Sequence, residues 1–303
     1  MSFTDFFWTS HEGLPLHARD YAPVSVSSGD SQKLPVICIH GLTRNARDFE
    51  GLAPRIAATG RRVLAVDVRG RGLSARDPNP MNYHPGTYAA DIVSLLAAAG
   101  IERAVFVGTS MGGLITMVLT SIRPHAIAAA VLNDVGPELS PVGLARIAGY
   151  TGMANRFETW DDAVAYAKAI NQAAFPAYGP EDWDTFARRL FDENDGEYIL
   201  AYDPDISAPI KAAAEAAAKT QAESGAALAP PDMYPLFRGL AKDRPLLLVR
   251  GGISDLIDAG IADRMRAAAP HMAYVEVPGV GHAPMLTEPQ AWAGIENLLE
   301  TAP

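Results

Sequence analysis

The sequence predicts an α/β protein whose mostly parallel sheet is covered by helices on both faces. Short apolar runs alternate with longer amphipathic stretches along much of the chain, and this alternation is typical of strand–helix–strand units. Each apolar run is followed within two residues by Gly, Asp, Asn, Pro or His, and most of these residue types often follow a strand. With 303 residues, the chain is long enough for one large core that carries an insertion.

Six apolar runs are the predicted strands. They cover residues 36–39, 63–66, 104–107, 128–132, 246–249 and 274–277. The amphipathic stretches between them predict helices over residues 48–59, 88–99, 111–122, 261–269 and 292–299. Since ligands bind beyond the carboxyl ends of strands in such sheets, we look for chemistry in the turns that follow these runs.

Residues 136–243 interrupt the alternation because they contain no convincing strand pattern. We expect this segment to form a helical cap on a core made of residues 1–135 and 244–303. An alanine-rich stretch over residues 210–222 predicts a helix, and a small-residue stretch at 224–231 leads back to the core. The cap is rich in aromatic residues, which either line a partly apolar pocket or form the cap's own core.

Charge and composition exclude several partners. A net charge of −10 and a pI near 5.1 disfavour nucleic acid, since no basic run offsets them. No apolar run is long enough to span a membrane.

The start of the sequence lacks a basic segment followed by an apolar one, so we expect a cytoplasmic protein. The only cysteine, Cys38, is expected to be a buried core thiol.

Motifs for cofactors and metals are missing. The sequence has no phosphate loop, no His-Glu-x-x-His and no Cys or His pair at metal-ligand spacing. We therefore expect neither a cofactor nor a metal.

The strongest motif is Gly108-Thr109-Ser110-Met111-Gly112, which follows the apolar run 104–107 and precedes the predicted helix 111–122. Glycines two residues before and after the serine permit a sharp strand-to-helix turn that presents the hydroxyl to the cleft. Ser110 is therefore the candidate nucleophile.

A serine hydroxyl needs a neighbouring base, and His282 is the candidate among seven histidines. It follows the last apolar run in a glycine-rich loop, where the ring can reach over the end of the sheet. The acid that orients the base is expected to be Asp255, after the run 246–249, because it gives the chain order Ser, Asp, His. Asp134, which also follows a strand, is the alternative acid or a pocket residue.

An oxyanion formed at Ser110 requires two backbone donors. The amide of Met111 is one, since it follows the nucleophile, and Leu42 in the early loop His40-Gly41-Leu42 is the candidate for the other. His40 is then expected to shape this loop, together with Gly41, rather than to act as a second base.

These segments, together with Asp67-x-Arg69-Gly70-x-Gly72-x-Ser74, resemble the α/β-hydrolase superfamily along nearly the whole chain. The resemblance implies an eight-stranded sheet, a helical lid after the sixth strand, and a cofactor-free triad at Ser110, Asp255 and His282. Within the superfamily the chain is similar to the branch that contains esterases, enol-lactonases, cofactor-free haloperoxidases and C–C hydrolases. Ser110 stands where dehalogenases and epoxide hydrolases have aspartate, which disfavours both.

The resulting hypothesis is a serine hydrolase that cleaves an ester or lactone of a small, partly apolar substrate through an acyl-enzyme. C–C bond hydrolysis, acyl transfer and perhydrolysis on the same triad remain alternatives. A ligand-binding receptor with a slow triad is a further one. The sequence favours neither a monomer nor a homodimer.

Overall fold

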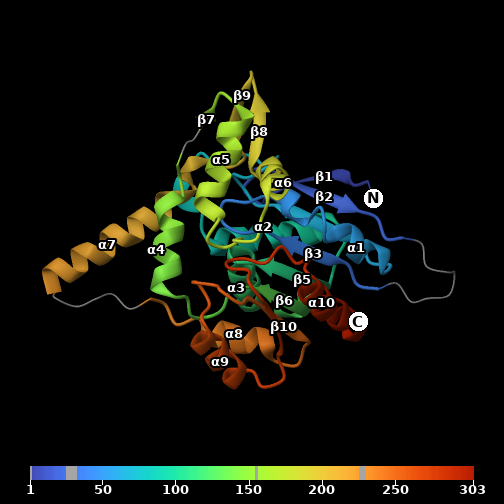
Figure 1. Ribbon diagram of the computed structural model, residues 1–303. Coiled ribbons are helices and arrows are strands. Elements are labelled where there is room, and N and C mark those ends of the chain that lie inside the picture. The colour runs from blue at the N-terminus through green and yellow to red at the C-terminus, as the bar shows by residue number, and fades with distance from the viewer. Residues whose placement is uncertain (1, 25–32, 154–155, 225–229) are drawn as a thin grey trace.

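The computed structural model describes residues 2–24, 33–153, 156–224 and 230–303. In this part of the chain the centre is an eight-stranded sheet of order β1-β2-β4-β3-β5-β6-β10-β11 (Figure 1). Its strands are β1 (Thr4–Thr9), β2 (Pro15–Tyr21), β3 (Val36–Ile39), β4 (Val63–Asp67), β5 (Ala104–Thr109), β6 (Ile127–Asn133), β10 (Leu246–Gly251) and β11 (Ala273–Val277). β1 pairs antiparallel with β2, and β2 with β4, whereas the other pairs are parallel. The predicted α/β class and mostly parallel sheet are confirmed.

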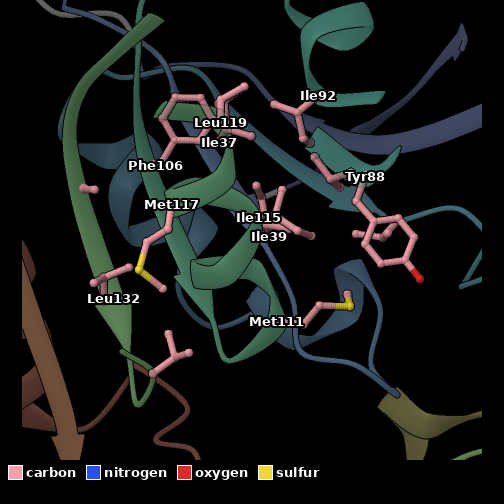
Figure 2. Close-up of a cluster of buried hydrophobic side chains, with 14 of the residues drawn as sticks. Ile37, Ile39, Tyr88, Ile92, Phe106, Met111, Ile115, Met117, Leu119 and Leu132 are labelled. Carbon is pink, nitrogen blue, oxygen red and sulfur yellow. The ribbon is translucent and has the colours of Figure 1, made fainter. Parts of the chain in front are cut away.

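Helices cover both faces of the sheet. They are α1 (Ala53–Ala58), α2 (Pro85–Ala98), α3 (Met111–Ile122), α8 (Tyr234–Ala241), α9 (Ala259–Ala268) and α10 (Pro289–Thr301). All four residues of β3 are buried, and successive side chains point to opposite faces. Ile37 and Ile39 belong to the core shared with α2, α3, α8 and α9, part of which Figure 2 shows. Val36 and Cys38 face α1 and α10, and burial raises the pKa of the Cys38 thiol.

After β6 the chain forms an inserted segment that we call the cap, whose helices are α4 (Pro141–Tyr150), α5 (Trp160–Asn171), α6 (Pro180–Leu190) and α7 (Ala208–Ser224). α8 lies within the predicted cap range 136–243 but packs against α3 of the core. Figure 1 shows α7 extending away from the body beside α4, and no residue of α7 is buried. Of the stretch at 224–231 that is predicted to return to the core, residues 225–229 lie outside the described residues.

The expectation of a cap without strands is wrong. The cap holds a second sheet of order β7-β9-β8, made of β7 (Arg156–Phe157), β8 (Phe191–Asn194) and β9 (Glu197–Leu200). β8 and β9 are joined by Asp195 and Gly196, which have φ values of 52° and 81°. An Asp-Gly pair with both residues at positive φ is a strong hairpin signal. The strands escape a search for apolar runs because they are short and half polar.

His17 of β2 ties the antiparallel edge of the sheet to β4. Its Nδ1 lies 2.7 Å from Asp67 and its Nε2 lies 3.0 Å from Asp5, while its backbone amide donates to Ser74 Oγ. Burial alone lowers the pKa of His17, but the hydrogen bonds and charges of the two carboxylates outweigh it, so the pKa is raised. With a carboxylate at each ring nitrogen, the imidazole is held in its protonated form.

This contact predicts a pH-dependent stability. A histidine whose pKa is higher in the folded state stabilises the fold fully below its unfolded pKa of about 6.5, and that contribution disappears as the pH rises through the folded pKa. We expect the free energy of unfolding in urea to fall as the pH rises above about 6.5 in the wild type and to fall less in His17→Gln. Equal slopes for the two proteins would contradict an ionised His17.

Candidate active site

Ser110 lies at a sharp turn between β5 and α3. Its φ of 51° is in the left-handed region, where the backbone of any residue other than glycine is strained. A Cβ at Gly112 would approach the Ile39 carbonyl oxygen to 2.0 Å, and one at Gly108 would lie 2.5 Å from the Gly112 backbone. Both glycines are therefore required for the close approach of the turn to β3 and to the start of α3. The predicted strand–turn–helix context of the motif is present.

His282 lies beside Ser110, with Nε2 2.9 Å from Ser110 Oγ. Its other ring nitrogen, Nδ1, lies 2.7 Å from Asp134 Oδ2. Because a carboxylate only accepts hydrogen bonds, Nδ1 carries the ring proton and Nε2 is left to accept the hydroxyl proton of Ser110. The three side chains form a continuous hydrogen-bonded chain.

Asp134 is fixed from several sides. It follows β6 directly and is fully buried. Its Oδ1 accepts from the Gly251 amide at 2.8 Å, and its Oδ2 also accepts from Ser254 Oγ at 2.6 Å. These donors keep the carboxylate oriented toward His282 and compensate for its burial.

The expectation that Asp255 orients His282 is contradicted by the geometry. Asp255 lies beyond the end of β10 and pairs with Arg146 of α4, with N–O distances of 2.5 and 2.8 Å. The hydrogen bond from Arg146 lowers the pKa of Asp255, although partial burial acts in the opposite direction. Asp255 therefore connects the core to the cap, and the alternative residue, Asp134, occupies the place beside His282.

The early loop that begins at His40 forms one wall of the site. Val68 N–H donates to His40 Nε2 at 3.1 Å, so the ring proton is on Nδ1, which donates to the Gly41 carbonyl at 2.7 Å. Burial lowers the pKa of His40 to about 4. A neutral, fully buried imidazole with both nitrogens engaged holds the loop rather than transferring protons. Gly41 and Leu42 line the same cavity as Ser110, and Met111 begins α3.

A cavity lies between Ser110 and the cap. The cap contributes Ile147, Tyr150, Tyr166, Ile170, Asn171, Phe175, Phe186, Leu190, Leu200 and Tyr202. Some cap rings therefore face the cavity, while others, such as Trp183, pack within the cap. Among the core residues of the wall, Arg44 pairs with Asp48 and stacks on Phe186, with its guanidinium 4.2 Å from the ring centroid. Most of the lining side chains are apolar or aromatic, but polar groups, among them one ion pair, also face the cavity.

The described residues show no cluster of three or more His, Cys, Asp or Glu placed to hold a metal. Among the helices in the described ranges, none is both long and apolar enough to cross a bilayer.

The strand-to-helix serine, the histidine and the buried aspartate are joined by hydrogen bonds. A family model for the alpha/beta hydrolase fold matches residues 35–289. The chain belongs to the α/β-hydrolase family. This α/β hydrolase is 36% identical over 260 residues to the 3-hydroxybutyrate-oligomer hydrolase of Cupriavidus necator, a match that covers 84% of each chain.

Two further similarities are informative. The α/β hydrolase is 38% identical over 103 residues to Esterase YbfF of Escherichia coli, across 34% of this chain and 39% of that esterase. A solved α/β hydrolase from Novosphingobium aromaticivorans is 44% identical with a TM-score of 0.86, and 99% of each chain is covered. The predicted family and the prediction of a hydrolase that acts on ester bonds are confirmed.

Several residues of this site were missed by the sequence reasoning. Ser254 precedes Asp255 and donates to Asp134, and Arg146 lies in the cap without a motif around it. Arg71 lies inside the glycine-rich segment that carries the family resemblance, and contacts both Leu42 and Met111. Only Arg71 had a sequence signal, namely its place between Gly70 and Gly72.

Proposed function

We propose that this α/β hydrolase cleaves esters through an acyl-enzyme on Ser110, with His282 as general base and Asp134 as the acid that orients it. The observation that carries the proposal is the hydrogen-bonded chain from Ser110 Oγ through the His282 ring to Asp134. This arrangement differs from the sequence-based hypothesis only in the identity of the acid.

The mechanism follows from the positions of the protons. His282 Nε2 takes the hydroxyl proton as Ser110 Oγ attacks the ester carbonyl, and Asp134 stabilises the imidazolium through Nδ1–H. The negative oxygen of the tetrahedral intermediate is stabilised by the amides of Leu42 and Met111 and by the N-terminus of α3. His282 then protonates the departing alcohol, and water, activated by the same nitrogen, releases the acid and restores the Ser110 hydroxyl.

The substrate is proposed to be a small, partly apolar ester or lactone. The apolar side chains of the cavity wall favour such an acyl group, while the Arg44–Asp48 pair offers one polar contact point. The Cupriavidus necator relative, 36% identical over most of both chains, is named for hydrolysis of 3-hydroxybutyrate oligomers. Short esters of hydroxy acids are therefore the substrates to test first.

A fluorophosphonate probe tests the nucleophile. We expect labelling of the folded protein at Ser110, identified by peptide mass spectrometry, because only this hydroxyl is paired with His282. Labelling should compete with p-nitrophenyl acetate and disappear after heat unfolding. Labelling at another residue, or none in folded protein, would contradict the proposal.

A substrate panel tests the ester class. It should contain p-nitrophenyl esters of increasing acyl length, simple lactones and the linear dimer and trimer of 3-hydroxybutyrate. We expect short esters to be hydrolysed faster than long ones, with acid and alcohol as the only products. Products of C–C cleavage or of acyl transfer would instead support the alternative chemistries on the same residues.

A further inference from the structure

Arg71 is almost fully buried behind the active site, at 1% exposure. Its Nε donates to the Leu42 carbonyl at 3.0 Å, and its Nη2 lies 3.7 Å from Met111 Sδ. Its Nη1 donates to the Arg69 carbonyl at 2.8 Å and to Tyr88 Oη at 2.9 Å. One planar guanidinium thus contacts both residues whose amides are proposed to bind the oxyanion.

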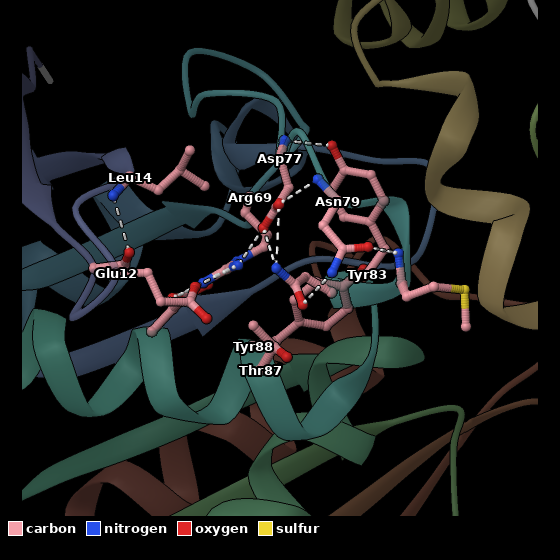
Figure 3. A network of polar contacts seen from close by, with 12 residues as sticks. Glu12, Leu14, Arg69, Asp77, Asn79, Tyr83, Thr87 and Tyr88 are labelled. Carbon is pink, nitrogen blue, oxygen red and sulfur yellow. Dashed lines mark hydrogen bonds and ion pairs between the residues drawn. The ribbon is translucent and has the colours of Figure 1, made fainter.

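The charge of Arg71 has no counter-ion among the residues that the structure describes. Its neighbour Arg69 offers a contrast, because Arg69 is also buried but pairs with Asp91 and with Glu12 and Asp77, which Figure 3 labels. A buried cation without a carboxylate carries a desolvation cost. A negative charge that develops nearby during the reaction would be attracted to it, because the interior screens charges weakly.

We propose that Arg71 is a positioning residue for the oxyanion hole. By holding the Leu42 carbonyl it fixes the backbone of that residue, and its contact with Met111 acts on the other donor residue. Its positive charge adds long-range stabilisation of the oxyanion. This inference rests on the proposed function, because it presupposes a tetrahedral intermediate at Ser110.

The segment from Gly70 to Gly72, which contains Arg71, is hydrogen-bonded to the cap. Asp203 N–H donates to the Gly70 carbonyl at 2.7 Å, and Gly72 N–H donates to the Ala201 carbonyl at 2.9 Å. Between these bonds Arg71 forms an antiparallel bridge with Tyr202, a residue of the cavity wall. The cap is therefore hydrogen-bonded to the segment that supports Leu42. On this proposal, a change in the position of the cap would change the geometry of the oxyanion hole through Arg71.

Arg61 provides a matched control. It is also buried at 1% exposure, and it donates to backbone carbonyls of Leu34, Leu299, Ala302 and Pro303. None of these residues lines the cavity. Arg61→Met removes a buried guanidinium of the same kind and so measures the purely structural cost of such a loss.

The test compares Arg71→Lys, Arg71→Gln and Arg71→Met with Arg61→Met. The kcat and KM for p-nitrophenyl acetate are measured with the inhibition constant of phenylboronic acid, which forms a tetrahedral adduct with a reactive serine. In Arg71→Met we expect kcat and boronate affinity to fall together by about 10- to 100-fold, with KM within about threefold. Lys, which keeps the charge, and Gln, which keeps a donor, should give intermediate losses.

Arg61→Met should unfold at a lower temperature but keep kcat and boronate affinity within about twofold of wild type. If Arg71→Met does not fold, the kcat and the boronate affinity of the folded Arg71→Lys and Arg71→Gln variants test the proposal. A folded Arg71 variant series with kcat and boronate affinity unchanged would overturn the inference while leaving the esterase proposal intact. A wild-type protein that neither labels at Ser110 nor hydrolyses esters would overturn the proposed function itself.

Discussion

Asp134→Asn is expected to lower kcat by about 10⁴-fold, because loss of the orienting carboxylate leaves a histidine in the wrong tautomer. In the wild type the carboxylate fixes the proton on His282 Nδ1 and leaves Nε2 free to accept from Ser110. An asparagine can keep its oxygen at the Oδ1 position for the Gly251 amide, but it then places an amide donor at the Oδ2 position, which faces both His282 and Ser254 Oγ. His282 is then driven to carry its proton on Nε2, where it cannot act as a base.

Asp255→Asn is the matched comparison, since it makes the same change in the acid that the sequence favoured. Asp255 contacts Arg146 rather than His282, and Arg146 belongs to α4, which contributes Ile147 and Tyr150 to the cavity wall. We expect kcat to change by less than about tenfold, with KM rising as α4 loosens. Steady-state kinetics and thermal unfolding of both variants are the measurements. A larger loss of kcat in Asp255→Asn than in Asp134→Asn would reverse the assignment.

The ambiguity between these two acids shows where sequence reasoning reaches its limit. Both follow a predicted strand and both lie between Ser110 and His282 in the chain, so chain order does not separate them. What separates them is the sheet order, in which β6 lies directly beside β5. Asp134 comes one residue after β6, whereas Asp255 lies four residues beyond β10. That distance lets the Asp255 loop turn toward the cap.

Much of the core followed from local patterns, because parallel strands buried on both faces give continuous apolar runs. β1 and β2 were not identified as strands, because β1 has a single buried residue at the edge of the sheet and the apolar residues of β2 are interrupted by polar ones. The cap sheet was missed although Asp195-Gly196 carried a hairpin signal. The position of Arg71 between two glycines marked its segment but not its role, and Arg146 had no signal at all, since the partners of a guanidinium are known only from the carbonyls and carboxylates that the fold brings to it.

Ser110→Ala is expected to lower kcat by about 10⁵- to 10⁶-fold, since without the hydroxyl no acyl-enzyme forms. Ser110→Gly should be equally inactive. The two variants differ in their backbone, because a residue at a φ of 51° is strained when it carries a Cβ and relaxed when it is glycine. We therefore expect the glycine variant to have a free energy of unfolding about 1 kcal/mol above that of the alanine variant.

Urea unfolding of both variants measures this difference, and ester hydrolysis by each measures the residual activity. Equal stabilities would mean that the turn carries no strain at this position, and substantial turnover by either variant would remove Ser110 from the mechanism. If both results are obtained, the backbone strain at Ser110 lowers the stability of the protein, and the same strained turn presents the hydroxyl to His282. The close contacts at Gly108 and Gly112 leave the turn little room to relax, so the strained backbone is what keeps the hydroxyl directed at His282.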